Sequence, residues 1–228
     1  MLTKNIKRTA ICALCILLSL LCFTSCGAKM KLEFESGSIV SKDDLEYSPV
    51  PLAYKPRTYI EDDKFATLKH PIYGKINLYE VEGTNGEWIY CPTDDTLYAL
   101  AGVTVPTLEQ MAPTSALIST NGDKELSLAV LEDREVVSTL ANIISSGEEY
   151  AVGDNALIPV KTYKLSFISP KYAHIVYSVT YYEYSDGTYR LYDRDMRLYY
   201  EIGDDIHKLL NTSEETTADT TESTSPNT

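Results

Sequence analysis

The sequence predicts an α+β protein in which an antiparallel meander sheet packs against one amphipathic helix. The first observation is the stretch from Tyr163 to Ile202, where segments rich in tyrosine and β-branched residues alternate with turn residues. The second is a set of apolar residues at helical spacing between Asp133 and Gly147. Strands, then a helix, then more strands is an order typical of α+β folds with antiparallel pairing.

The meander is predicted to contain four strands. Apolar and polar residues alternate from Tyr163 to Phe167, which is the pattern of a half-buried strand. Asp186-Gly187 favours a tight hairpin between the second and third strands, because glycine accepts the positive φ that such a turn needs. The four strands are expected at 163–167, 175–184, 188–192 and 197–202.

Two further hairpins are predicted upstream. A glycine-containing turn at 82–86 separates the strands of the first, and Asn121-Gly122 separates those of the second. Residues 96–100 continue the first hairpin as a strand or as a short helical turn. The paired strands are 76–81 with 87–90, and 116–120 with 125–130.

One convincing helix lies between the second hairpin and the meander. Asp133 is placed as its N-cap and Gly147 as the residue that follows its C-cap. Its apolar stripe is expected to pack on the meander sheet. A short terminal helix is expected from Asp204 through Leu210. The stripe consists of Val136, Val137, Leu140, Ile143 and Ile144.

The first 26 residues have the layout of a secretory signal. Lys4, Lys7 and Arg8 precede a mostly apolar run from Thr9 to Phe23, and small residues follow. This run is shorter than the ~20 residues that a helix needs to span a bilayer, so a permanent transmembrane anchor is disfavoured.

Phe23-Thr24-Ser25-Cys26 resembles the lipobox of bacterial lipoprotein signal peptides. The family prefers Leu where Phe23 stands. In that family the cysteine is acylated and becomes the mature N-terminus, so the resemblance implies a lipidated Cys26 on the extracytoplasmic face of the cell membrane. The alternative is an ordinary secretory signal cleaved near Ser25 or Ala28, which would leave a freely secreted protein.

Composition divides the chain into four parts. Residues 26–58 contain several prolines and few apolar residues, which predicts a lipidated N-terminus followed by an extended linker, with one strand over 32–40 left open. Residues 211–228 are rich in Ser, Thr and acidic residues and are expected to be disordered. The predicted parts are the signal peptide at 1–25, the linker at 26–58, a single domain at 59–210 and the tail at 211–228.

The charge of the mature chain limits its partners. Residues 1–25 hold three of the 20 basic residues and none of the 33 acidic ones, which leaves 17 basic residues and a net charge of −16. Nucleic acid is excluded because it requires a basic footprint, and direct contact with anionic lipid headgroups is disfavoured for the same reason. Only Cys26 and Cys91 remain, so no internal disulfide is expected, and Cys91 is predicted to be buried and unreactive.

No catalytic, metal or cofactor motif is found. There is no Gly-x-Ser-x-Gly elbow and no glycine-rich phosphate loop. The three histidines share no metal-ligand spacing. Two acidic pairs lack the spacing of a calcium loop and are expected to serve turns and helix caps. The histidines are His70, His174 and His207, and the pairs are Asp193/Asp195 and Asp204/Asp205. No catalytic residue, metal ligand or cofactor is therefore predicted.

The surplus of tyrosine, 18 residues against four phenylalanines, suggests a recognition surface. Within 175–184, the odd-numbered residues are the more apolar and are expected to face the helix. The even-numbered residues are expected to face outward, and Tyr182 and Tyr184 form the candidate binding face. The alternative is that tyrosine serves only as a strand former that tolerates a solvated face.

The function expected from these features is that of a membrane-anchored lipoprotein that acts as a non-enzymatic binding module. Its partners would be the membrane, through the N-terminal lipid, and a protein or glycan of the cell envelope. The alternative is a small envelope hydrolase or accessory factor. A solute-binding receptor is disfavoured because the chain lacks the alternating βα units that build two closing lobes.

Overall fold

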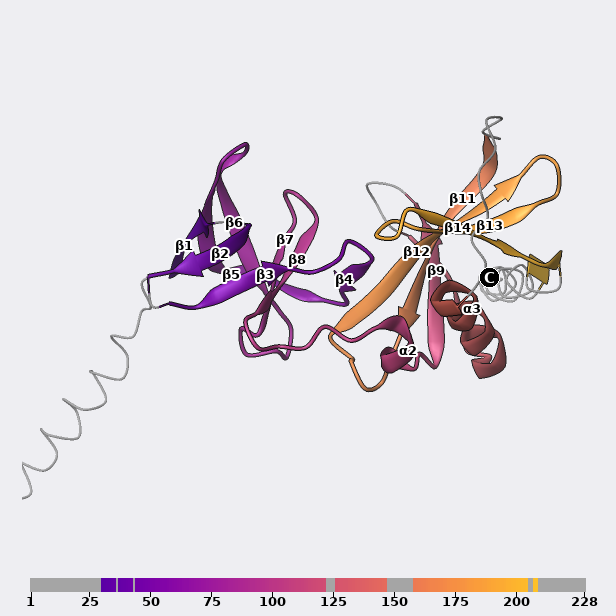
Figure 1. Ribbon diagram of the computed structural model, residues 1–228, viewed down its shortest axis with the longest axis horizontal. Helices are drawn as coiled ribbons and strands as arrows, with labels where there is room; N and C mark the ends of the chain where they lie inside the picture. Colours follow the sequence, from indigo (N-terminus) through magenta and orange to yellow (C-terminus); the bar gives the residue numbers. More distant parts are fainter. Residues whose placement is uncertain are drawn as a thin grey trace, which may run out of the picture.

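The computed structural model describes residues 30–35, 37–42, 44–121, 126–146, 158–204 and 207–208. Strands account for 54% of it and helices for 12%, so the fold is mostly β. A closed barrel lies at one end of the long axis and a second sheet at the other (Figure 1). The expected α+β class with one meander sheet and one helix is therefore wrong. The signal peptide, Cys26 and the tail at 211–228 lie outside the described residues.

The barrel is built by the first half of the described chain. Its strand order is β1-β2-β3-β8-β7-β6-β5, and parallel pairing of β5 with β1 closes it. Its strands are β1 (Met30–Glu35), β2 (Ser38–Ser41), β3 (Glu46–Pro49), β5 (Tyr59–His70), β6 (Gly74–Val81), β7 (Trp88–Cys91) and β8 (Thr96–Leu100). Its interior is filled mainly by Leu32, Ile39, Tyr47, Leu68, Leu78, Ile89 and Tyr98.

Strands β1 to β3, together with β4 (Tyr54–Pro56), occupy the range in which an extended linker was expected. Leu32, Ile39 and Tyr47 are at most 1% exposed there. Each of these strands is only three to six residues long, so each carries little apolar periodicity of its own. β1 pairs with β5, β3 with β8 and β4 with β12, all of which come later in the chain.

The second sheet has the strand order β10-β9-β11-β12-β13-β14. The four predicted meander strands are confirmed as β11 to β14, and the hairpin before the helix is confirmed as β9 and β10. β9 pairs with β11, which adds this hairpin to the meander. The bounds are β9 (Ser115–Thr120), β10 (Ser127–Leu131), β11 (Pro159–Ile168), β12 (Ile175–Tyr184), β13 (Tyr189–Asp193) and β14 (Leu198–Ile202).

Two helices, α2 (Leu108–Met111) and α3 (Arg134–Ser146), lie beside β9 (Figure 1). Asp133 caps α3 as expected, because its Oδ1 accepts the N–H groups of Glu135 at 2.9 Å and Val136 at 3.3 Å. Most of the predicted stripe is buried in the core that α3 shares with the sheet. None of the helices described here has the length and apolar character needed to cross a membrane.

The barrel and the sheet share one hydrophobic core. Along β8, Leu97 and Ala99 face this shared core while Tyr98 faces the barrel interior. β12 joins the two parts through the backbone, because one of its edges pairs with β4 at Ile175–Tyr177 and with β13 at Thr180–Glu183. The side chains near this change of partner form the candidate site.

Candidate functional site

The second sheet has a core face and an open face, and the side chains of β12 alternate between them. Its odd-numbered residues from Ile175 to Tyr181 belong to the shared core, together with the α3 stripe. Its even-numbered residues share the other face with Lys164 of β11 and Tyr192 of β13, both of which lie directly opposite Thr180. We call this second side of the sheet the open face.

Tyr182 lies at the centre of a cluster of rings on the open face. Its ring centroid is 6.0 to 6.4 Å from those of Tyr184, Tyr192 and Tyr199. Tyr192 and Tyr199 pair across β13 and β14, with ring centroids 4.7 Å apart. Tyr182, Tyr192 and Tyr199 are half-buried, so each ring is held by its neighbours and still presents an edge to solvent.

Tyr184 does not present the outward surface that was expected of it. It is only 6% exposed, because the Arg190 guanidinium lies 4.8 Å from its ring centroid. Tyr184 is therefore the buried member of the ring cluster. The half-buried Tyr192 and Tyr199, for which the sequence gives no indication, take the outward place beside Tyr182.

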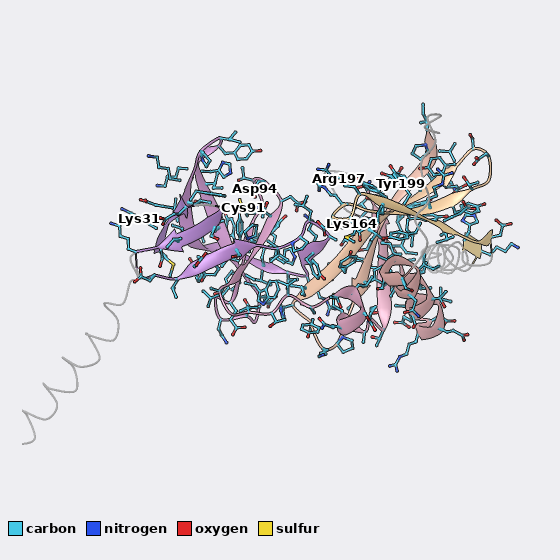
Figure 2. All side chains as sticks on the ribbon, in the orientation of Figure 1. Lys31, Cys91, Asp94, Lys164, Arg197 and Tyr199 are labelled. Carbon is cyan, nitrogen blue, oxygen red and sulfur yellow. The ribbon has the colours of Figure 1, made fainter. Side chains whose placement is uncertain are left out.

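A polar cleft adjoins this cluster where the barrel meets the sheet. It consists of two neighbouring hollows of about 320 and 350 Å³. Lys55, Asp95 and Lys164 line both of them, and Tyr192 lines the second. Figure 2 shows Lys164 on the part of the sheet nearest the barrel. The cleft and the tyrosine cluster are thus parts of one continuous surface.

Asp95 organises the cleft from the turn between β7 and β8, where it adopts a φ of 56°. Its Oδ2 lies 2.5 Å from Lys55 Nζ, which also donates to the Asp95 carbonyl oxygen at 2.8 Å. The Tyr90 hydroxyl donates to Oδ1 at 2.7 Å. Arg194 Nη1 lies 4.0 Å from Oδ2 on the other side. One carboxylate therefore ties the barrel turn to β4 and to the β13–β14 turn.

Lys55 is the most deeply placed charge of the cleft. It is 8% exposed, and burial lowers its pKa, an effect that the hydrogen bond it donates to Asp95 opposes. Its charge is retained by this partner, because an unpaired buried ammonium group would be costly. Lys55 and Asp95 are therefore a supporting pair on which the more exposed charges are arranged.

The cleft carries more positive than negative charge, in contrast to the whole chain. Four basic and two acidic side chains line it, whereas the sequence has 20 basic and 33 acidic residues. Charges gathered in a hollow act on a ligand more strongly than charges scattered over a convex surface. The basic residues are Lys55, Arg57, Lys164 and Arg194, and the acidic ones are Glu61 and Asp95.

Hydroxyl groups continue the open face beyond Lys164. Ser119 lies opposite Lys164 in the register and is 1% exposed, and its Oγ has no hydrogen-bond partner among the described residues. In a neighbouring row, the Oγ atoms of Ser166 and Ser178 are 2.8 Å apart. All three serines are buried, so this strip forms polar packing beneath the cationic groups.

The acidic pair Asp193/Asp195 serves the fold, as the sequence predicted. Asp193 Oδ1 accepts the N–H groups of Asp195 at 2.8 Å and Met196 at 3.1 Å, and its Oδ2 accepts the Tyr177 hydroxyl. The Asp195 carboxylate accepts the N–H groups of Leu52 and Ala53. Both carboxylates line a third hollow of about 380 Å³ on the core side, with their oxygens already engaged. Asp205 lies outside the described residues.

The three histidines lie on different parts of the fold. His70 ends β5, His174 lies beside Trp88 with ring centroids 5.4 Å apart, and His207 stacks on Tyr189. No group of three or more potential metal ligands occurs within the described ranges. Cys91 is buried as predicted, and burial raises the pKa of its thiol to about 11.

Comparison of the chain with protein-family models, with curated proteins and with solved structures gives no match.

Proposed function

We propose that this protein is a lipid-anchored, extracytoplasmic binding module, and that its ligand-binding surface is the open face of the second sheet together with the adjoining cleft. The observation that carries the proposal is the local reversal of charge: a cleft with four basic and two acidic side chains on a chain with a net charge of −13. Such a cleft attracts an anionic group that the rest of the surface repels.

The class of ligand follows from the two halves of this surface. Arg194 is exposed at the edge of the cleft, and Lys164 is half-exposed within it, so both can reach a carboxylate or phosphate. The edges of Tyr182, Tyr192 and Tyr199 offer rigid, partly apolar area with polar tips beside these charges. An acidic glycan of the envelope presents both features, because its rings carry a flat apolar side and its substituents carry the charge.

The alternative of a small hydrolase finds less support in the geometry. Asp193 and Asp195 share the hollow on the core side, and catalysis by such a pair needs an oxygen that can give or take a proton. Their oxygens already accept hydrogen bonds from Tyr177 and from backbone N–H groups. This arrangement assigns both carboxylates to the fold.

Membrane anchoring is tested at Cys26, which lies outside the described residues. Replacing Cys26 with Ala is expected to move the protein from the membrane to the soluble fraction and to abolish fatty-acid labelling, because two or three acyl chains are what anchors a lipoprotein stably. A Cys26→Ala variant that stays in the membrane with its N-terminus intact would show that residues 1–25 act as the anchor.

Ligand binding is tested by titrating the mature protein with an oligogalacturonate and with its neutral methyl ester. Lys164→Gln and Arg194→Gln should each weaken binding of the acid by about tenfold or more, the usual scale for a charge-assisted contact. Tyr199→Ala should weaken binding of both probes. Arg134→Gln, which removes the same charge from an exposed position on α3, is the matched control. Equal affinities for all variants would refute the site, and binding of poly-glutamate alone would point to a protein partner.

A further inference from the structure

The outer wall of the barrel at β1, β5 and β6 carries a second cationic surface. Leu32, Leu68 and Ile76 fill the barrel interior, so the residues that alternate with them face outward. In the register Glu33 lies opposite Lys69, and Lys69 lies opposite Lys75. Together with Lys31 and Lys64 these residues line a shallow hollow of about 600 Å³. We call this surface the lysine face.

The lysine face is not neutralised by its surroundings. Lys31, Lys64, Lys69 and Lys75 form no ion pair with any residue that the structure describes, and Glu33 is the one carboxylate that lines the hollow. The net charge of −16 predicted for the mature chain disfavours contact with anionic headgroups. This value is an average over the whole surface. The lysine face shows that the charge is unevenly distributed.

An exposed apolar tip adjoins the lysine face. At the β5–β6 turn, Ile72 is 79% exposed and Tyr73 is 52% exposed, and Phe34 at the end of β1 is 38% exposed. His70 holds them together: its ring centroid lies 5.4 Å from that of Phe34 and 4.7 Å from that of Tyr73, and its Nδ1 accepts the N–H groups of Ile72 and Tyr73. Apolar and aromatic side chains flanked by lysines are typical of segments that enter a membrane interface.

The position of this surface matches the position of the predicted anchor. Cys26 precedes Met30, the first residue of β1, by four residues, and four residues span at most about 14 Å. Around the barrel, the β1–β5 seam lies opposite the β7–β8 wall that packs on the second sheet. A bilayer held at Cys26 would therefore be near the lysine face, and the second sheet lies at the other end of the long axis (Figure 1).

We infer that the lysine face and the β5–β6 tip dock on an anionic bilayer surface. The lysines contact the headgroups, while Ile72 and Tyr73 enter the interface. This inference rests on the proposed acylation of Cys26, which brings the surface to the bilayer. Docking gives the module a fixed orientation on the bilayer.

The test uses the mature, acylated chain on vesicles. In the acylated protein the Cys26 thiol is blocked, and Cys91 is fully buried, so Ile72→Cys supplies one reactive thiol at the tip for an environment-sensitive dye. Asp186→Cys, in the exposed β12–β13 turn, is the matched control. On vesicles that contain phosphatidylglycerol, the dye at 72 should shift to the blue and be quenched by lipid-borne quenchers. The dye at 186 should emit as it does in water.

Removing charge should reverse this signal. Exchange of Lys31, Lys69 and Lys75 for Gln should lower the ratio of docked to undocked protein about fivefold for each lysine. Raised salt should act in the same direction because it screens exposed charges. A dye at 72 that remains in water on anionic vesicles would overturn the inference, as would a blue shift that survives loss of the three lysines.

Failure of the anchor and failure of docking give different results. Flotation with neutral phosphatidylcholine vesicles reports the acyl chains alone, so a protein that does not float there lacks the anchor. Docking is still measured in that case, with anionic vesicles at excess lipid. If soluble dextran sulfate protects the lysines from acetylation while anionic vesicles do not, the lysine face binds a polyanion and its assignment to the bilayer is wrong.

Discussion

The carboxylate of Asp195 accepts a hydrogen bond from the backbone N–H of Ala53 at 2.7 Å, across 142 residues of sequence. The same carboxylate accepts the N–H of Leu52, and the Ala53 carbonyl in turn accepts the N–H of Ser178 at 2.7 Å. The β13–β14 turn is thereby joined to the segment that leads from the barrel into β4. This contact sets the position of β4 against β12 and so fixes the floor of the cleft.

Loss of this carboxylate should destabilise the junction. Asp195→Ala leaves the N–H groups of Leu52 and Ala53 without their acceptor, and Ala53 is only 1% exposed. An unsatisfied buried donor costs about 1–3 kcal/mol, so the free energy of unfolding measured with denaturant should fall by that order. Glu201→Ala, on an exposed site of β14, is the control. Equal losses for the two variants would mean that Asp195 does not hold the junction.

The barrel and the sheet should unfold together because they share a core. Trp88, the one tryptophan of the chain, lies in this core and is 2% exposed. Its fluorescence therefore reports the junction, whereas far-ultraviolet circular dichroism reports all the strands. The two signals should give the same unfolding curve. Separate midpoints would show that the barrel and the sheet unfold independently.

The helix α3 should be essential to the sheet. Leu140 is fully buried in the shared core, and truncation of such a side chain costs about 2–5 kcal/mol through lost contacts and a residual cavity. Leu140→Ala should lower the melting temperature markedly, and Ser138→Ala on the exposed side of the same helix should not. An unchanged melting temperature for Leu140→Ala would place the helix outside the core.

The second sheet could be predicted from sequence because its information is local. β12 is ten residues long, the Asp186-Gly187 turn dictates its hairpin, and Asp133 marks the start of α3. The barrel could not be predicted in this way. Its first three strands have four to six residues each, and the pairing that closes it joins β1 to a parallel strand, with Met30 opposite Ala66. Short strands with distant partners leave little periodicity to detect.

The candidate site was found only in part. The sequence predicts Tyr182, because alternation along one strand separates its two faces. The sequence does not predict Lys55, Asp95 and Lys164 as site residues, because they meet only when β4 and the β7–β8 turn approach the sheet. Burial of Tyr184 depends on Arg190, which reaches it across the β12–β13 hairpin. Neither the meeting of the cleft residues nor the contact between Arg190 and Tyr184 is indicated by a local pattern in a single sequence.

Acidification should weaken the fold through His174. Burial lowers the pKa of His174 below its usual value of 6.5, so between the two values the unfolded chain binds more protons than the folded one. The free energy of unfolding should therefore rise with pH through this window and fall as pH drops below about 6.5. His174→Gln should reduce this dependence when stability is measured from pH 5 to pH 8. An unaltered slope would assign the effect to other groups.

The most direct test of the proposed function is to map ligand contacts on the mature protein by hydrogen–deuterium exchange. Exchange is measured with and without the oligogalacturonate used in the binding titration. The proposal predicts slower exchange in β12, in the β7–β8 turn at Asp95 and in the β13–β14 turn at Arg194, with α3 and the barrel wall at β1 unchanged. Protection elsewhere with these three segments unaffected would contradict the assignment of the open face and the cleft as the binding surface.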